Sequence, residues 1–430
     1  MATSATDSAT GTISYNVKDL SLADQGKRRT EWAFQSMPAL RSIRKQLIKT
    51  QAFRDRRIGA LVDINAETAN LVIALRDGGA SVSIASPNPA ATQDDVAASL
   101  VRDYAIPTFA IQGESDKMHN QHLEAVLGSK PHFVIDHDAE LLSRFITRRP
   151  ETPDSAIAGS EGSNRGLSRL GALAAKGKLP YPVIAVGDSR TKHLVNDRYG
   201  AAQSIVEGIM RATQALVAGL TVVIAGYGSC GAGVASKLKG LGAQIIVTEI
   251  DPFKAVQALL QGHRVMSMNE AASLGDLFIT ITGGKSVIGR DHFDKFKNGA
   301  ILCNAGHSDV EIDLETLGQL TSSRRTMRPW VEEFTLRDGR RIHVLAGGQA
   351  IHMSATEGTT ASATDLFLAN HALSVEYLLK HRGSLPNAVH PVPYDIDCRV
   401  AQARLEATGL KIDRLSLEQE QFLAGLSELA

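Results

Sequence analysis

The 430-residue chain has little cysteine, little aromatic content and no excess charge of either sign. Its three cysteines, Cys230, Cys303 and Cys398, show neither disulfide nor metal-ligand spacing, so we expect reduced thiols, no metal site and a cytoplasmic protein. The 46 basic and 46 acidic residues give no net field that would favour nucleic acid or an anionic membrane. No apolar run is long enough to span a bilayer. These absences favour a small-molecule ligand.

Three closely spaced glycines follow an apolar strand at residues 221–225 and precede helix-forming residues. Gly226, Gly228 and Gly231 have the pattern of a dinucleotide-binding βαβ unit, in which glycines permit a tight turn and let backbone N–H groups approach a pyrophosphate. Glycine-rich turns also occur where a chain simply reverses, but here Glu249 ends the next strand. A carboxylate there accepts hydrogen bonds from ribose hydroxyls and repels a 2′-phosphate, which predicts NAD rather than NADP.

Strand-like and helix-like segments alternate along most of the chain, and the length exceeds what one hydrophobic core supports. We therefore predict an α/β fold with two doubly wound parallel-sheet domains, a substrate domain and a Rossmann NAD domain, plus a C-terminal helical tail. The expected strands are residues 58–62, 81–85, 108–111, 132–135, 183–186, 221–225, 243–249, 277–281 and 300–304.

The same pattern divides the chain into segments. We expect the N-terminal part of the substrate domain over residues 1–199, the NAD domain over 200–355, a return to the substrate domain over 356–402 and the tail over 403–430.

Three local features complete the predicted organisation. A long helix is expected over residues 362–380, leading back to the first domain. The polar stretch 148–165 is expected to be a loop and a candidate substrate lid. Residues 1–12 are expected to form a loose tail.

Ordered motifs from about Asp19 to Leu423 resemble the adenosylhomocysteinase family, the NAD-dependent hydrolases of S-adenosylhomocysteine. The matching stretches include residues 31–33, 67–69, 92–95, 191–192, 248–252 and 303–313. The resemblance implies that bound NAD⁺ takes a hydride from the sugar 3′-carbon, after which a base removes the 4′ proton and the 5′ substituent leaves. Water then adds at C5′ and the ketone is reduced. The resemblance also implies a homotetramer.

The resemblance implies a role for several residues. Lys192 would act near the 3′-hydroxyl and the 4′-hydrogen, and His307 near the 5′ side and the cofactor. Glu67 and the segment 347–352 would address the exocyclic amine of adenine, because a 6-oxo base would leave the carboxylate unpaired. Simpler alternatives remain: Lys192 as a solvated lysine, His307 as a core histidine, and Glu67 as an acid favoured at a helix N-terminus.

The predicted site residues divide by role into catalytic groups, substrate contacts and cofactor contacts. The catalytic set is Lys192, His307, His137, Asp63 and Asn196; the substrate set is Glu67, Asn65, Gly162 and His352; the cofactor set is Gly226, Gly228, Ser229, Cys230, Gly231, Glu249, Ser163, Asn164, Thr282, Asn304 and Asp197.

Several positions depart from the family pattern around the sugar. Asp63 stands where the family has histidine, and His137 stands where it has the second acid of an Asp-Asp pair. Gly162 replaces the acid that holds the sugar hydroxyls, so we expect open space there for a branched sugar. The chain also lacks the family's terminal Lys and Tyr that reach a neighbouring subunit's NAD, which predicts weaker cofactor retention.

The family's Asp-Asn pair after the lysine is inverted here to Asn196-Asp197. On an α-helix this inversion turns the carboxylate by about 100°. We therefore expect Lys192 to lose its fixed anionic partner and to be more readily neutral.

These departures predict altered 5′ chemistry. The sharpest hypothesis is a nucleoside 5′-dehydratase, of the kind needed for angustmycin-type antibiotic biosynthesis. In it the 5′-hydroxyl leaves as water, assisted by Asp63 and His137, and the ketone is reduced before water returns. Three alternatives stay open: an ordinary adenosylhomocysteinase whose changes compensate one another, an enzyme that releases the ketone with NAD as cosubstrate, and an inactive NAD- and adenosine-binding regulator.

Overall fold

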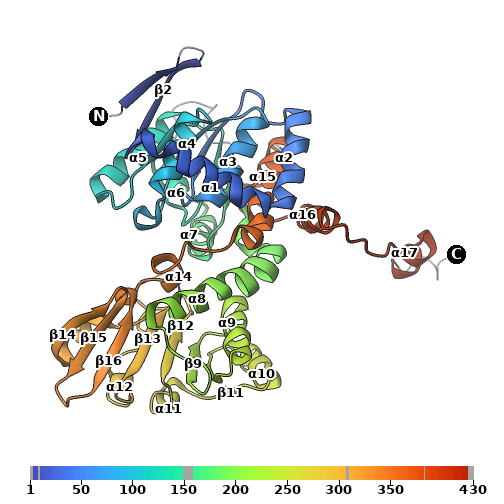
Figure 1. Ribbon diagram of the computed structural model, residues 1–430. Coiled ribbons are helices and arrows are strands. Elements are labelled where there is room, and N and C mark those ends of the chain that lie inside the picture. The colour runs from blue at the N-terminus through green and yellow to red at the C-terminus, as the bar shows by residue number, and fades with distance from the viewer. Residues whose placement is uncertain (1–2, 8–9, 149–157, 307–308, 382, 425–430) are drawn as a thin grey trace.

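The computed structural model describes residues 3–7, 10–148, 158–306, 309–381 and 383–424. Figure 1 shows two bodies, one above the other, each built on its own sheet. The predicted fold class is confirmed: both bodies are α/β, and a helical segment follows them at the C-terminal end. In the described chain, no helix is long and apolar enough to cross a membrane.

The first sheet has nine strands in the order β1-β2-β5-β4-β3-β6-β7-β8-β17, parallel throughout except for the β1–β2 pair. Its strands are β1 (Thr3–Asp7), β2 (Thr10–Val17), β3 (Arg57–Leu61), β4 (Ser81–Ala85), β5 (Thr108–Ala110), β6 (Phe133–Asp136), β7 (Ala158–Glu161), β8 (Val183–Ala185) and β17 (Val389–Pro391). The helices of this body are α1 (Ala23–Gln35), α2 (Pro38–Thr50), α3 (Ala66–Asp77), α4 (Asp94–Arg102), α5 (Asp116–Gly128), α6 (Glu140–Arg148), α7 (Asn164–Ala175), α15 (Ala361–Lys380) and α16 (Tyr394–Ala407), with short 3₁₀ turns η1 (Leu20–Leu22), η2 (Pro89–Ala91) and η3 (Val186–Asp188).

Helices cover both faces of this sheet, and alternate side chains of its strands pack against the two helical layers. Ile58 and Ala60 pack with α2, α3 and α15, whereas Leu61 packs with α5 and α6. Burial on both faces explains why these parallel strands read as near-continuous apolar runs in the sequence.

The second sheet has eight strands in the order β11-β10-β9-β12-β13-β16-β15-β14. Its strands are β9 (Thr221–Ala225), β10 (Gln244–Thr248), β11 (Arg264–Val265), β12 (Leu277–Thr280), β13 (Ala300–Asn304), β14 (Thr321–Arg328), β15 (Val331–Leu336) and β16 (Arg341–Leu345). The helices are α8 (Ala202–Thr213), α9 (Ser229–Gly240), α10 (Pro252–Leu260), α11 (Met268–Ala271), α12 (Arg290–Phe293), α13 (Leu314–Leu320) and α14 (Ile351–Ser354), with the 3₁₀ turn η5 (Ala346–Gly348). Strands β14 and β15 extend the parallel sheet with antiparallel pairs, an extension that the sequence did not predict.

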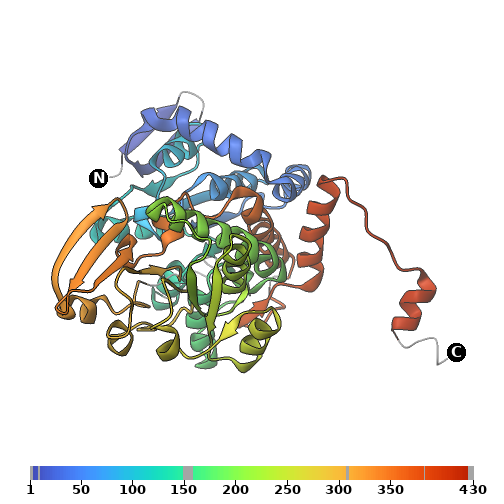
Figure 2. The same ribbon diagram turned by 60° about the horizontal axis from the view of Figure 1, so that its bottom comes forward.

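The chain passes between the bodies twice. It leaves the first sheet through a ten-residue π-helix, η4 (Lys192–Ala201), that continues into α8. It returns from η5 through α14 to α15, which confirms the predicted long helix. Beyond α16, the chain and its last helix α17 (Leu417–Leu423) extend away from both bodies (Figures 1 and 2).

Two loop predictions were wrong for the described residues. Residues 3–7 pair antiparallel with β2 instead of forming a loose tail, because β2 offers an open edge with unpaired backbone groups. Residues 158–161, expected in a loop, form strand β7 between β6 and β8. Residues 149–157 of the candidate lid lie outside the described residues.

Candidate functional site

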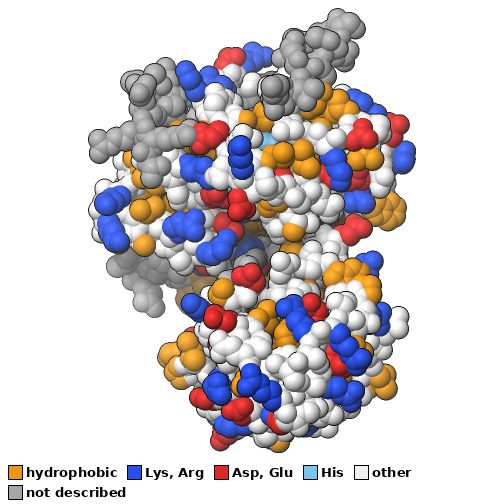
Figure 3. Space-filling model, turned by 90° about the vertical axis from the view of Figure 1, so that its left-hand side faces the viewer, with side chains coloured by type: hydrophobic (Ala, Val, Ile, Leu, Met, Phe, Trp, Pro, Cys, Tyr) orange, Lys and Arg blue, Asp and Glu red, His pale blue; other side chains and the backbone are white. Residues whose placement is uncertain are grey.

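A cavity of about 2310 Å³ lies between the two bodies and is lined from both sheets. Figure 3 shows the hollow at the waist of the molecule. In open parallel sheets, ligands bind at the carboxyl ends of the strands, where the strand order reverses. The order reverses between β3 and β6 in the first sheet and between β9 and β12 in the second. Asp63, His137, Gly226 and Thr282 follow these four strands, and all four line the cavity.

The glycine loop after β9 has the geometry that a dinucleotide needs. Gly226 has a φ of +99°, and a β-carbon there would lie 2.7 Å from the carbonyl oxygen of Ile281. A β-carbon on Gly231 would lie 2.1 Å from the Gly226 oxygen, so the helix can approach the strand only without a side chain. Gly228 has open space around it and faces the cavity at the start of α9. This open N-terminus offers backbone N–H groups to a phosphate, and so the loop fits NAD.

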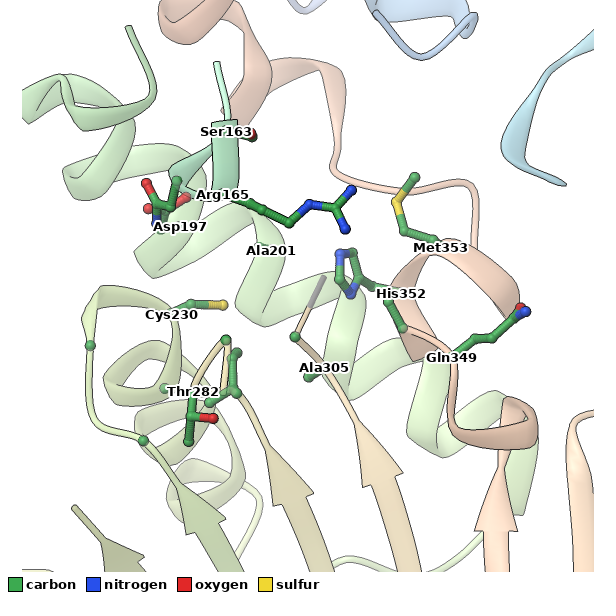
Figure 4. A pocket seen from close by; sticks show the side chains of 18 of the residues that line it. Ser163, Arg165, Asp197, Ala201, Cys230, Thr282, Ala305, Gln349, His352 and Met353 are labelled. Carbon is green, nitrogen blue, oxygen red and sulfur yellow. The ribbon is translucent and has the colours of Figure 1, made fainter. Parts of the chain in front are cut away.

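Two predicted cofactor residues beside this loop have described partners. Glu249 accepts hydrogen bonds from the backbone N of Tyr227 (2.6 Å), Ile250 (2.7 Å) and Asp251 (3.0 Å), which fixes the end of β10 to the glycine loop. Burial, together with the nearby charge of Asp197, raises the pKa of the Cys230 thiol to about 12. This thiol is therefore neutral at physiological pH, and it points into the cavity (Figure 4).

A buried carboxylate that the sequence analysis missed supports the loop after β12. Glu311 is fully buried and accepts hydrogen bonds from the N (3.0 Å) and Oγ1 (2.9 Å) of Thr282 and from Gly283 N (2.8 Å). Glu311 could have been identified by its position within residues 303–313, a stretch that matches the family. Glu311 thus fixes the turn that carries the predicted cofactor contact Thr282.

Asn304, another predicted cofactor contact, holds loops together. It donates to Gly348 O (2.9 Å) and accepts from Gly306 N (2.8 Å), and so links the ends of β13 and β16. His307, predicted as a catalytic residue, lies outside the described residues.

The prediction that Lys192 loses its anionic partner was wrong. Lys192 Nζ donates to Asp197 Oδ2 at 3.2 Å, and both side chains line the cavity. Five residues along an α-helix differ by about 140° in direction, but residues 192–201 form a π-helix, whose i→i+5 bonding brings residues five apart onto one face. Although burial opposes it, the hydrogen bond from His193 and the charge of Lys192 lower the pKa of Asp197. Asn196 also lines the cavity.

The prediction of open space beside Gly162 was also wrong. A β-carbon on Gly162 would lie 2.4 Å from Cδ2 of His137 and 2.8 Å from Cζ of Phe367. The imidazole therefore occupies the volume that the glycine leaves. Phe367 and the fully buried His371, both on α15, pack against this ring. The centroid of each lies 5.5 Å from the centroid of His137.

Asp63 follows the end of β3, the strand that pairs with β6. The ends of these two strands are joined, because the backbone N of His137 donates to Leu61 O at 2.9 Å. Burial, and secondarily the negative charge of Asp138, raises the pKa of Asp63 to about 6. A carboxyl group with a raised pKa keeps its proton to higher pH, which suits a proton donor.

A pair of buried acids under this edge was missed by the sequence analysis. Asp136 and Glu161 end the adjacent strands β6 and β7 in register and are fully buried. Glu161 accepts from the backbone N of Asp138 (3.0 Å), Ala139 (2.8 Å) and Ser163 (2.7 Å). Burial and the charge of Glu161 raise the pKa of Asp136. Glu161 thus holds the turn that follows His137.

The start of α7 brings Ser163, Asn164 and Arg165 to the cavity. Ser163 caps the helix by accepting from Gly166 N at 2.8 Å. Arg165, which the sequence analysis missed, pairs with both carboxylate oxygens of Asp138 (3.2 and 2.6 Å). Figure 4 shows Arg165 reaching toward His352 of α14, a predicted substrate contact that is buried and lines the same cavity.

Of the residues predicted to address adenine, Gly347 and His352 line the cavity. Asn65 lines the cavity, and its side chain caps α3 by accepting from Thr68 N at 2.9 Å. Glu67 is not among the described lining residues of this cavity. Burial raises the pKa of Glu67 to about 7, with a further contribution from Glu357. Its contact with a base stays a prediction.

Comparisons with known proteins agree with this arrangement. Residues 14–154 match the family S-adenosyl-L-homocysteine hydrolase, and residues 197–358 match the S-adenosyl-L-homocysteine hydrolase NAD binding domain. The chain is 46% identical to adenosylhomocysteinase from Aquifex aeolicus, covering 96% of this chain and 99% of that protein. It is 44% identical to the Gloeobacter violaceus adenosylhomocysteinase, covering 97% of both.

Among solved structures, NAD⁺-bound 3-phosphoglycerate dehydrogenase from Entamoeba histolytica matches with a TM-score of 0.45 and 14% identity, covering 78% of this chain and 98% of that chain. The near full-length identity and the two family matches, together with the glycine loop, establish that the chain belongs to the adenosylhomocysteinase family and that its cofactor is NAD.

Proposed function

We propose that the protein transiently oxidises an adenine nucleoside at its 3′-type hydroxyl and eliminates the 5′-hydroxyl as water, as a nucleoside 5′-dehydratase in angustmycin-type antibiotic biosynthesis. The observation that carries this proposal is the position of Asp63, which lines the cavity together with His137 where the paired strands β3 and β6 end. Burial raises the pKa of this carboxyl group to about 6. Family membership and the NAD loop support the redox part of the cycle.

The glycine loop at Gly226, Gly228 and Gly231 would hold NAD⁺, which would supply reversible hydride transfer at the sugar carbon. Lys192 faces the cavity and is paired with Asp197. We assign to its neutral amine the proton of the sugar hydroxyl, which it releases to solvent before it takes the C4′ proton. That second proton returns to the sugar oxygen when the ketone is reduced. Removal of the C4′ proton leaves an electron pair that forms the C4′–C5′ double bond as the 5′ substituent departs.

The 5′ step separates a dehydratase from a hydrolase of a thioether. Hydroxide is a much poorer leaving group than a thiolate, so an acid must protonate it as the C–O bond breaks. Because burial raises the pKa of Asp63, its carboxyl group keeps a proton to higher pH than an exposed aspartic acid does. His137, at the end of the adjacent strand β6, is the second group that we assign to this side.

An ordinary adenosylhomocysteinase is the second candidate. The 46% identity to the Aquifex aeolicus protein over nearly the full length favours it, because the relatives at this similarity carry that name. In that case Asp63 and His137 would compensate for each other's altered chemical type at the same sheet edge. A tetrameric assembly and a cytoplasmic location also belong to the proposal.

Mass spectrometry of reactions with S-adenosylhomocysteine, adenosine and branched adenine nucleosides separates the candidates. A product lighter by one water supports the dehydratase, and release of homocysteine supports the hydrolase. Accumulated ketone with reduced cofactor indicates an enzyme that oxidises the nucleoside with NAD as cosubstrate, and tight binding without turnover indicates a regulator. In each active case Lys192→Ala abolishes turnover, and unchanged turnover in this variant contradicts the shared mechanism.

A further inference from the structure

One oxygen of Asp197 contacts two side chains that can carry a positive charge. Oδ2 accepts from Lys192 Nζ at 3.2 Å and from His193 Nδ1 at 2.9 Å. The other ring nitrogen of His193, Nε2, lies 3.0 Å from Asp188 Oδ1. The four side chains therefore form a continuous chain from the cavity outward, with exposed fractions of 11% for Lys192, 16% for Asp197, 34% for His193 and 71% for Asp188.

The π-helix makes this sharing feasible. His193 precedes Asp197 by four residues and Lys192 precedes it by five, so both lie about one turn before the carboxylate. Asp188 comes from η3, the turn that follows strand β8. His193 is thus fixed from both sides by parts of the chain whose positions the first sheet determines.

Both ring nitrogens of His193 face carboxylate oxygens, which favours the doubly protonated ring. The hydrogen bond to Asp197 raises the pKa of His193, burial opposes this, and the bond to Asp188 adds to the increase. The described interactions of Asp197 are with His193 and Lys192. Its charge also acts on Cys230 of α9, but this thiol is neutral. When the His193 ring is protonated, the negative charge of Asp197 is therefore divided between the imidazolium and the Lys192 ammonium group.

We propose that His193 is a positioning residue for the Lys192 base: by sharing Oδ2 of Asp197, it limits how strongly that carboxylate holds the Lys192 ammonium group. A carboxylate that also binds an imidazolium stabilises a second cation less than it would alone. Lys192 can then both release a proton and take one back within the cycle. This inference rests on the proposed function of Lys192.

The first test is the pH dependence of kcat in His193→Ala and His193→Asn. With the ring removed, Asp197 acts on Lys192 alone, so the rising limb of kcat against pH moves to higher pH while KM changes little. A displacement of about one pH unit lowers kcat about tenfold on that limb. Asparagine keeps a donor near the position of Nδ1, so His193→Asn lies closer to the wild type. A limb that stays in place or moves to lower pH in His193→Ala overturns the proposal.

The second test does not require turnover. Trace acetylation with acetic anhydride, followed by mass spectrometry of the Lys192 peptide, reports how readily this amine loses its proton at a fixed pH. We expect slower labelling of Lys192 in His193→Ala than in the wild type, and no change in His381→Ala, a control at an exposed histidine. Equal or faster labelling in His193→Ala overturns the inference.

The two tests keep the two proposals distinguishable. If Lys192→Ala retains full turnover, the proposed function fails, yet the labelling result still decides whether His193 shares the carboxylate. If Lys192→Ala is inactive but His193→Ala labels and reacts like the wild type, only the inference about His193 fails. Thermal unfolding of each variant verifies that it is folded.

Discussion

The imidazole of His137 fills the space above Gly162 so closely that a β-carbon at position 162 would lie 2.4 Å from Cδ2 and 2.5 Å from Nε2 of the ring. The two positions therefore depend on each other. A carboxylate in the place of Gly162 requires a smaller side chain than histidine at position 137.

We expect Gly162→Glu alone to destabilise the protein and abolish turnover, because the new side chain would displace His137 and press on Phe367. Adding His137→Asp to make the double variant should recover stability, with an interaction free energy of about 0.5–3 kcal/mol between the two sites. Denaturant unfolding of the two single variants and the double variant measures this coupling. Additive effects would contradict the dependence.

Glu311→Gln tests the support of the cofactor loop. The carboxylate accepts from Thr282 and Gly283, whereas a glutamine amide would direct N–H groups at donors and leave buried polar groups unpaired. We expect a loss of about 1–3 kcal/mol in stability and weaker NAD binding by calorimetry. Glu315→Gln, an exposed site on α13, is the matched control. Unchanged NAD affinity in Glu311→Gln would mean that the loop holds its shape without this acid.

Asp63→Asn tests the proton donor on the 5′ side. The pKa of Asp63 is raised to about 6, so the protonated form decreases as the pH rises through that value. Elimination of a hydroxyl should therefore show a falling limb of kcat near pH 6, which disappears in Asp63→Asn together with most of the activity. Asp116→Asn on α5 is a control outside the cavity. The hypothesis fails if the limb survives in Asp63→Asn.

Asp136→Asn tests the buried acid pair. Burial and Glu161 raise the pKa of Asp136, so the folded protein binds a proton that the unfolded chain releases at the same pH. The stabilising contribution is complete below the unfolded-state pKa and is lost as the pH rises through the folded-state value. Asparagine keeps an acceptor for Leu142 N, so the variant should lose less unfolding free energy between mildly acidic and alkaline pH than the wild type. Identical pH dependence in urea titrations would argue against the raised pKa.

The elements predicted correctly from the sequence are those determined by the residues within the element itself. Residues 81–85 and 300–304 form strands with the predicted bounds, since parallel strands buried on both faces are short apolar runs. Gly226, Gly228 and Gly231 were recognisable because backbone geometry there excludes side chains.

The errors share a different cause, because each depended on how a segment packs. On a π-helix the inverted Asn196-Asp197 pair still directs the carboxylate toward Lys192, whereas an α-helix would turn it away. No residue pattern in this segment indicates i→i+5 bonding. From the sequence alone, a glycine at position 162 suggests open space. In the structure β6 lies beside β7, and this pairing places the His137 ring against Gly162. Glu311 and Asp136 were missed because their partners are backbone groups far along the chain or side chains on an adjacent strand.

The double passage of the chain between the two bodies limits how they can move. The outgoing and returning connections lie against each other, since η4 packs on α15 and α8 packs on α14. Such a paired connection permits the gap to widen and narrow about one axis, whereas twisting would pull one connection while compressing the other. Lys192 is the first residue of the outgoing connection, so a change in the relative position of the two bodies would also move its amine.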